Sequence, residues 1–171
     1  MKNAILGNTI ENVNLKSEDI RFLLEIGLWV NVFSDDNRHL IIAEALNKTV
    51  CDKKIKIKGY LITNWRVYLI LDCDFVQAEL FVIHFQKLIR FYLIQLETDE
   101  FIPIQFDQQL FQAFPFYDYV LANLLLGKKS ENPNVDLNLS YYKDFLEGYN
   151  FCSVQFHKGR IGPVIVNAVS P

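Results

Sequence analysis

The sequence predicts a single α+β domain in which helices pack on a four-stranded antiparallel sheet. Short segments that alternate apolar and polar residues lie between longer segments with helical periodicity. Two of the short segments follow one another closely enough to form a hairpin. With 171 residues, the chain is also long enough to bury one substantial core. The expected order of elements is strand, helix, strand, strand, helix, strand.

The N-terminal third predicts a lead-in helix, a strand and a longer helix. Lys16–Glu25 has an amphipathic helical pattern, with Ser17 as the expected N-cap. Leu28–Phe33 alternates and is rich in strand-forming residues, which predicts the first strand. From Ser34, the pattern predicts a helix to about Val50. Its expected buried face consists of Leu40, Ala43, Leu46 and Val50.

The middle of the chain predicts a hairpin followed by a long helix. Lys54–Thr63 and Arg66–Cys73 both alternate and are joined by a tight connection, so we expect an antiparallel pair. Asp74 is the expected cap of a helix over Phe75–Leu96, which is apolar on more than one face. Phe101–Phe106 is the expected fourth strand. These elements in this order predict the split βαβ, or ferredoxin-like, layout with strand order 4-1-3-2, both helices on one face and the other face open.

The C-terminal part predicts additional helices and a hairpin. Pro115–Leu126 is an expected helix that ends at Gly127. The remaining expectations are a polar loop over Lys128–Asn138, a helix over Ser140–Glu147 ended by Gly148, and a hairpin of Phe151–Phe156 with Val164–Val169 about Lys158-Gly159. We treat 1–171 as one domain, with a core over 26–127 and a C-terminal extension over 128–171.

Composition restricts the function classes. Hydrophobic residues make up 51% of the chain and charged residues 22%, which is too apolar for a disordered chain. No apolar run is long enough to cross a bilayer, and no signal-peptide pattern is present, so we expect a soluble cytoplasmic protein without a membrane partner. The net charge of -3 does not indicate a general nucleic-acid-binding surface. The excess of apolar side chains predicts an oligomer interface.

The cysteines and histidines do not form a recognisable metal pattern. Cys51, Cys73 and Cys152 are widely spaced, which predicts reduced and mostly buried thiols rather than a disulfide framework or a zinc site. His39, His84 and His157 lie on different elements, so we interpret them as surface or core residues rather than ligands.

The stretch Tyr60–Leu71, YLITNWRVYLIL, resembles the signature strand of the single-tyrosine transposases of insertion-sequence and REP-associated type. In that family it reads roughly YVLMPNHVHLLL, and its paired His hold a divalent metal on one face of a central strand. Arg66 and Tyr68 occupy the two positions here. A guanidinium stays protonated and a phenol is a poor ligand at neutral pH, so no metal site is expected, and Mg or Mn would matter only if activity were retained.

A second segment of resemblance is Asp118–Asn123, DYVLAN, which is similar to the family's YIxxNP segment. The resemblance places the family's nucleophilic tyrosine at Tyr119 and a frequent metal ligand at Asn123, although Leu124 replaces the family's Pro. It also implies a homodimer, and a role in DNA transposition for active members. The implied protein is transposase-like and catalytically inactive, with a capacity to bind single-stranded or hairpin DNA.

Each candidate residue also has a structural interpretation. Tyr119 and Asn123 could be packing residues, and Arg66 and Tyr68 could form an exposed cross-strand pair or lie under the third helix instead of binding DNA. The only basic run is Lys53, Lys54, Lys56 and Lys58. Its lysines could guide a phosphate backbone, or they could protect a sheet edge from association.

Two further functions remain open at this stage. One is a homo-oligomeric structural or protein-interaction module with no nucleic-acid role, which the acidic net charge favours. The other is an active metal-dependent strand transferase, whose replacement ligands could be Asp72 and Asp74. Asp74 is more simply a helix cap. A continuous positive groove from Lys54 and Lys56 to Arg66 and the third helix would favour DNA binding.

Overall fold

The structure of the chain is a computed structural model that describes residues 19–27, 29, 34–97, 109–128 and 145–167. Its strands and helices, in chain order, are β1 (Ile20–Ile26), α1 (Asp35–Lys53), β2 (Lys56–Ile62), β3 (Arg66–Asp72), α2 (Phe75–Glu97), β4 (Phe111–Pro115), α3 (Tyr119–Leu125) and α5 (Val154–His157).

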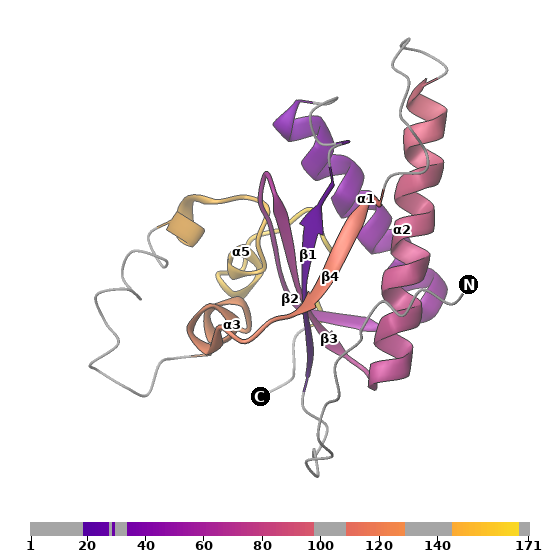
Figure 1. Ribbon diagram of the computed structural model, residues 1–171. Helices are drawn as coiled ribbons and strands as arrows, with labels where there is room; N and C mark the ends of the chain where they lie inside the picture. The colour runs from indigo at the N-terminus through magenta and orange to yellow at the C-terminus, as the bar shows by residue number, and fades with distance from the viewer. Residues whose placement is uncertain (1–18, 28, 30–33, 98–108, 129–144, 168–171) are drawn as a thin grey trace.

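The four strands form one sheet in the order β2-β3-β1-β4, and every neighbouring pair is antiparallel. This is the expected order 4-1-3-2, counted from the other edge. Helices α1 and α2 cover one face of the sheet, and α3 and α5 lie on the opposite side (Figure 1). We call these the first face and the second face. The second face was expected to be open, and instead it carries a third layer.

The position of the first strand was predicted wrongly. Residues expected to continue a lead-in helix form β1, which pairs with both β3 and β4 at the centre of the sheet. Phe22, Leu24 and Ile26 face the first-face core, while Leu23 faces the second. In so short a segment the apolar residues also fit one face of a helix, so pairing with β3 and β4 decides for the strand. The predicted strand Leu28–Phe33 lies outside the described residues apart from Trp29.

Helix α1 confirms the helix predicted from Ser34, and it extends three residues beyond Val50. Lys54 was expected to begin the next strand, but it is the left-handed C-cap of α1, with φ of 56°. Leu40 was expected to be buried and is 53% exposed. Ala43 and Leu46 are buried as expected, and Val50 is partly buried against the core. The other buried residues of α1 are Arg38, His39, Ile42, Ala45 and Thr49.

The hairpin and the long helix were predicted correctly. Strands β2 and β3 pair in register except for a bulge between Ile57 and Gly59. The bulge interrupts the strict alternation expected for this strand. The Asp74 carboxylate accepts a hydrogen bond from the Gln77 N–H at 2.8 Å, and the Gln77 side chain accepts one from the Asp74 N–H at 3.3 Å. This reciprocal capping fixes where α2 begins.

The fourth strand of the sheet is β4, and the segment predicted for it, Phe101–Phe106, lies outside the described residues. Pro115 was expected inside the next helix but ends β4, and α3 begins at Tyr119. The Asp118 carboxylate caps α3 by accepting the Leu121 N–H at 3.0 Å. Gly127 adopts φ of 67° just after α3, as expected for a helix stop.

The predicted C-terminal hairpin is wrong. Val154–His157 is α5, and the residues before it pair with the outer edge of β2: Leu61 bridges Cys152, and the Ile62 N–H donates to the Phe151 carbonyl at 2.9 Å. The chain then crosses this edge, and Val164 and Val166 are buried in the first-face core. Further along, the Asn167 N–H donates to the Ile57 carbonyl of β2 at 3.0 Å, so both parts of this segment contact β2 rather than each other. Of the predicted loop and fourth helix, only Lys128 and residues 145–147 are described.

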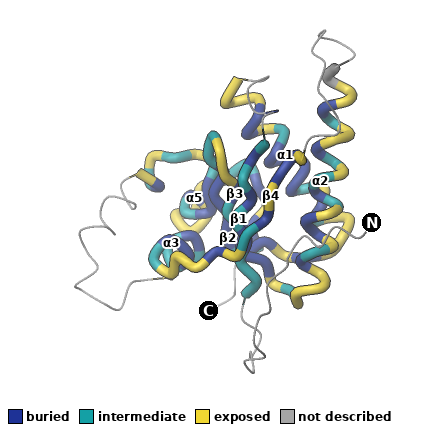
Figure 2. Tube along the Cα trace, viewed as in Figure 1, coloured by how far each residue is buried: buried dark blue, intermediate teal, exposed yellow. Residues whose placement is uncertain are grey.

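Two hydrophobic cores flank the sheet (Figure 2). The first-face core joins the sheet to α1 and α2 and includes the fully buried rings of Phe81, Phe85 and Tyr60. The second-face core is smaller, and its buried members are Leu61, Ile70, Phe116, Leu121, Ala122, Leu125, Leu146 and Cys152. Among the described residues, no helix has both the length and the apolar character that a membrane span requires.

Candidate functional site

A hollow of about 470 Å³ lies on the second face, between the sheet, the start of α3 and the helical turn at residues 145–148. We call it the second-face hollow. Its lining is mostly apolar and aromatic, with Thr63 and Asp118 contributing polar groups. The lining residues are Leu23, Leu61, Thr63, Tyr68, Pro115, Phe116, Tyr117, Asp118, Leu121, Phe145 and Leu146.

Arg66 and Tyr68 lie on the same face of β3, as their spacing predicts. The Tyr68 ring lies in the wall of the hollow, where it packs edge-on against Phe116 with 5.2 Å between centroids. The Arg66 guanidinium is half exposed and pairs with the Glu25 carboxylate on β1 at 3.3 Å. A hydrogen bond with Tyr68 and the charge of Glu25 raise the pKa of Arg66. Arg66 and Tyr68 therefore place a cation, held by Glu25, beside the aromatic wall of the hollow.

Tyr119 is brought close to the sheet at the other end of this wall. It is the first residue of α3 and is 67% exposed. The Arg21 guanidinium of β1 lies 5.0 Å from the centre of the Tyr119 ring, a cation–π distance. Asn123 is one turn further along α3 and half-buried. The tyrosine and a cation thus lie together beside the hollow.

The lysines predicted to bind DNA do not form one surface with Arg66. Lys56 pairs with Asp72 in the β-ladder, whereas Arg66 lies at the other end of β3, roughly 20 Å away. Lys54 belongs to the end of α1. The Lys58 ammonium forms ion pairs with Asp19 at 2.7 Å and Asp72 at 3.2 Å. These carboxylates raise the Lys58 pKa against the opposing effect of burial.

The acidic residues near the end of β3 have structural partners. Asp72 pairs with Lys58, and Asp74 caps α2. Within the described part of the chain, no three His, Cys, Asp or Glu side chains come close enough together to hold a metal ion.

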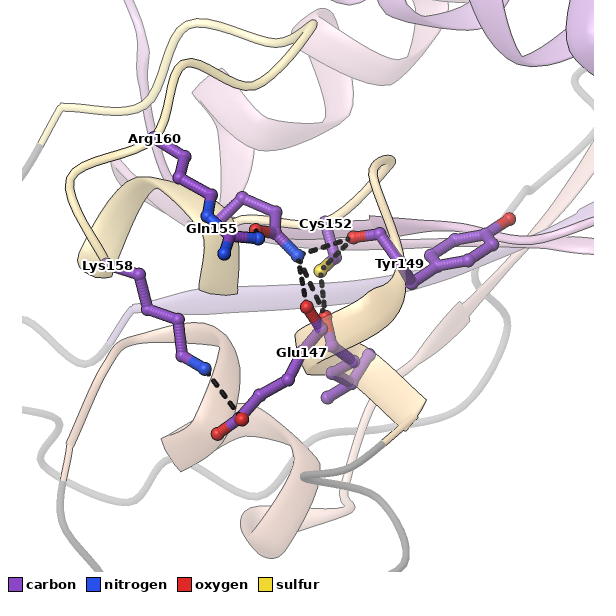
Figure 3. Close-up of polar contacts among 7 residues, drawn as sticks. Glu147, Tyr149, Cys152, Gln155, Lys158 and Arg160 are labelled. Atoms are coloured by element: carbon purple, nitrogen blue, oxygen red, sulfur yellow. Dashed lines mark hydrogen bonds and ion pairs between the residues drawn. The ribbon is translucent and has the colours of Figure 1, made fainter.

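The outer wall of the second-face layer is fixed by polar contacts between residues 146 and 160 (Figure 3). The buried Gln155 amide donates to the carbonyls of Leu146, Glu147 and Tyr149 at 3.0–3.2 Å. It thereby ties α5 to the end of the helical turn at residues 145–148. Lys158 pairs with Glu147 at 2.7 Å. These contacts hold Phe145 and Leu146 at the rim of the hollow.

Several site residues were missed by sequence reasoning. Arg21 was assigned to a helix, although the alternation of IRFLLEI puts Arg21, Leu23 and Glu25 on one face of a strand. Tyr117 is 71% exposed and Phe145 50% exposed at the hollow, and no periodic pattern marks either of them. Trp65, 61% exposed at the hairpin turn, was treated only as a connection.

The cysteines and histidines are dispersed. All three cysteines are free thiols; Cys152 is buried and Cys73 half-buried, but Cys51 is exposed, so the expectation of burial is wrong for Cys51. His39 is buried against Phe151. His84 contacts Asp52 at 3.0 Å, and the ring of His157 contacts the Leu125 carbonyl at 3.0 Å.

Comparisons of the chain with models of protein families, with curated proteins and with solved structures found no match.

Proposed function

We propose that this is a catalytically inactive, transposase-like protein on a ferredoxin-like split βαβ scaffold, which binds single-stranded or hairpin DNA beside the second-face hollow. The order of elements and of strands supports the scaffold. The observation that carries the binding proposal is the Arg21 guanidinium placed over the exposed Tyr119 ring. Single-strand-binding surfaces combine such cations with aromatic rings on which bases stack.

The same geometry supports the absence of strand transfer. A tyrosine nucleophile of the transposase type acts on a phosphate that a metal ion polarises. In this chain Arg66 and Tyr68 occupy the positions where the family resemblance places the metal-binding His. Arg66 forms an ion pair with Glu25, and Tyr68 packs against Phe116. We therefore assign Tyr119 to stacking rather than to covalent chemistry.

The test is incubation with short hairpin oligonucleotides, with Mg²⁺ or Mn²⁺, scored for gel retardation and for a covalent adduct. We expect retardation at low salt and no adduct. Tyr119→Ala should weaken binding about tenfold, because a stacking ring is lost, while Tyr119→Phe should retain most of it. Arg21→Gln should weaken binding and reduce its salt dependence.

Lys56→Gln is the matched control, because Lys56 is exposed and lies far from Arg66 along the sheet. It should leave the retardation nearly unchanged. An adduct that disappears in Tyr119→Phe would show that the chain is an active strand transferase.

A second candidate is a protein-interaction module with no nucleic-acid role. The dispersion of the lysines and the pairing of Arg66 with Glu25 favour it, because they leave no continuous positive groove along the described second face. No retardation at low salt would decide for this module and against DNA binding.

A further inference from the structure

Helix α2 carries an exposed apolar stripe on its outer side. Val76, Leu80, Ile83, Phe91 and Ile94 are each between 40% and 64% exposed. With 100° per residue, they and Lys87 fall within roughly 80° of arc, so they form one continuous line along the helix. The exposed side of α2 runs its length away from the sheet (Figure 2). Soluble monomers rarely expose such a line of large apolar side chains.

The stripe is complementary to itself in the antiparallel direction. Val76 and Ile94 lie at equal distances along the chain from Phe85, and so do Ile83 and Lys87. Leu80 is matched by the neighbouring pair Arg90 and Phe91. If a second α2 packs antiparallel about a two-fold axis at Phe85, Val76 meets Ile94 of the other copy, and Leu80 meets Phe91. A two-fold interface requires this self-matching pattern.

The charges at the stripe fit the same arrangement. Lys87 is the one charged side chain on the line, and in the antiparallel register it meets Ile83, where its methylene stem can cover the apolar surface. Glu79 and Arg90 lie on one flank of the stripe. In an antiparallel pair of identical helices, each flank of one helix faces the same flank of the other. Glu79 of one copy then lies beside Arg90 of the other, so the flanks carry complementary charges.

We infer that α2 is a self-association surface, through which two copies of this chain pair with their α2 helices antiparallel. The inference stands independently of DNA binding, because α2 and the second-face hollow lie on opposite sides of the sheet (Figure 1). From Val76 to Ile94 the stripe is roughly 27 Å long. An interface of this size belongs to the small class, so we expect a dissociation constant on the order of tens of micromolar.

Sedimentation velocity over a range of about 5 to 500 µM tests the inference. The wild-type chain should shift from monomer to dimer. Ile83→Lys should abolish the dimer, because it places each new lysine against Lys87 of the other copy. Ile83→Lys combined with Lys87→Glu should restore it, since each introduced ammonium then meets an introduced carboxylate of the other copy; parallel pairing would oppose like charges and give no recovery.

Ile161→Lys is the matched control, because Ile161 is fully exposed and lies outside α2. It should leave the dimer unchanged, and circular dichroism should show that every variant is folded. A monomeric wild-type chain at the highest concentration, or a dimer that survives Ile83→Lys, would overturn the inference. Absence of recovery in the double variant would overturn the antiparallel register. A monomer that binds phosphatidylcholine–phosphatidylglycerol vesicles through the stripe would assign this surface to lipid instead and also overturn it.

Discussion

The two faces of the sheet are held by different kinds of interaction. On the first face, α1 and α2 bury a large and continuous aliphatic and aromatic core, and the buried polar residues of this layer, Arg38, His39 and Thr49, all belong to α1. On the second face, the apolar core is smaller, and the layer depends on the buried polar side chains of Ser153 and Gln155. The first face should therefore supply most of the stability, while the second face supplies the hollow and its exposed aromatic residues.

Ser153 illustrates how the second face is assembled. Its hydroxyl donates to the Leu125 carbonyl at 2.6 Å and accepts the Tyr60 N–H at 3.0 Å, which joins α3, β2 and the residues before α5. Directional contacts of this kind fix geometry, but each contributes only modestly to the free energy of folding. A layer built in this way can open without loss of the whole core.

The largest effect should come from the first-face core. Phe85 is fully buried and packs against Phe111 with 5.0 Å between ring centroids. Phe85→Ala should lower the free energy of unfolding by about 3–5 kcal/mol, because it removes a buried ring and leaves a cavity. Phe91→Ala, on the same helix but 52% exposed, should cost about 1 kcal/mol or less. Urea unfolding at low protein concentration measures both, and equal losses would contradict the assignment of the core.

A smaller loss is expected on the second face. Ser153→Ala leaves the buried Tyr60 N–H without its acceptor, which should cost about 1–3 kcal/mol in urea unfolding. The control is Thr49→Val, which removes a buried hydroxyl that only donates to the Ala45 carbonyl within α1. It should cost about 1 kcal/mol or less. If the two substitutions cost the same, Ser153 does not link the layers in the way described.

Stability should also fall at mildly acidic pH because of His39. Burial, followed by the charge of Arg38, lowers the pKa of His39 below its ordinary value of 6.5, and Asp35 and Asp36 oppose this only in part. Below pH 6.5 the unfolded chain therefore binds the proton more readily than the folded chain does, so the free energy of unfolding decreases until the lowered pKa is passed. Chemical unfolding between about pH 7.5 and 5.5 should show this decrease.

His39→Phe is the matched variant for this measurement. It keeps an aromatic ring against Phe151, which lies 4.8 Å from His39 between ring centroids, and it removes the titrating group. Its stability should change less over the same pH range. A slope as steep as that of the wild-type chain would assign the pH dependence to other groups.

The smallest effect concerns local opening of the second face, measured by thiol labelling. Cys152 is buried, and its thiol donates to the carbonyls of Leu146 and Tyr149 at 3.3 and 3.2 Å. In a Cys51→Ser, Cys73→Ser background, Cys152 should react with a thiol reagent at urea concentrations below those of global unfolding. Protection of Cys152 up to the global transition would show that the two faces unfold together.

The wild-type chain supplies a second comparison of thiol reactivity. Burial, together with the charges of Asp74 and Asp72, raises the pKa of Cys73 to about 11, so little thiolate is present at neutral pH. Cys51 is exposed and should react first. Cys51→Ser should remove this fast phase.

The sequence predicted those parts of the fold in which one local signal dominates. The β2–β3 hairpin has alternation, and α2 has a long apolar pattern that begins at a capping aspartate. The prediction failed for β1 and for the C-terminal segment. β1 was interpreted as the end of an amphipathic helix although its residues alternate, and Val154–His157 carries strand-forming residues that form a helix after the chain pairs with β2. In both segments, tertiary contacts override local preference.

The candidate site divides in the same way. The positions of Arg66 and Tyr68 on one face of β3 follow from their spacing alone. The placement of Arg21 over Tyr119 depends on β1 being a strand, and this depends on its pairing with β3 and β4. A contact between residues so far apart in sequence leaves no periodic signal.

By itself, the sequence determined the α+β class, the β2–β3 hairpin and the long helix α2, because these follow from local periodicity and capping. Only the tertiary structure decided that the second face is covered, that a hollow remains there beside Tyr119, and that α2 keeps an exposed apolar stripe. These features depend on which apolar surfaces find a partner within the chain, and such pairing is a property of the packed molecule rather than of any one segment.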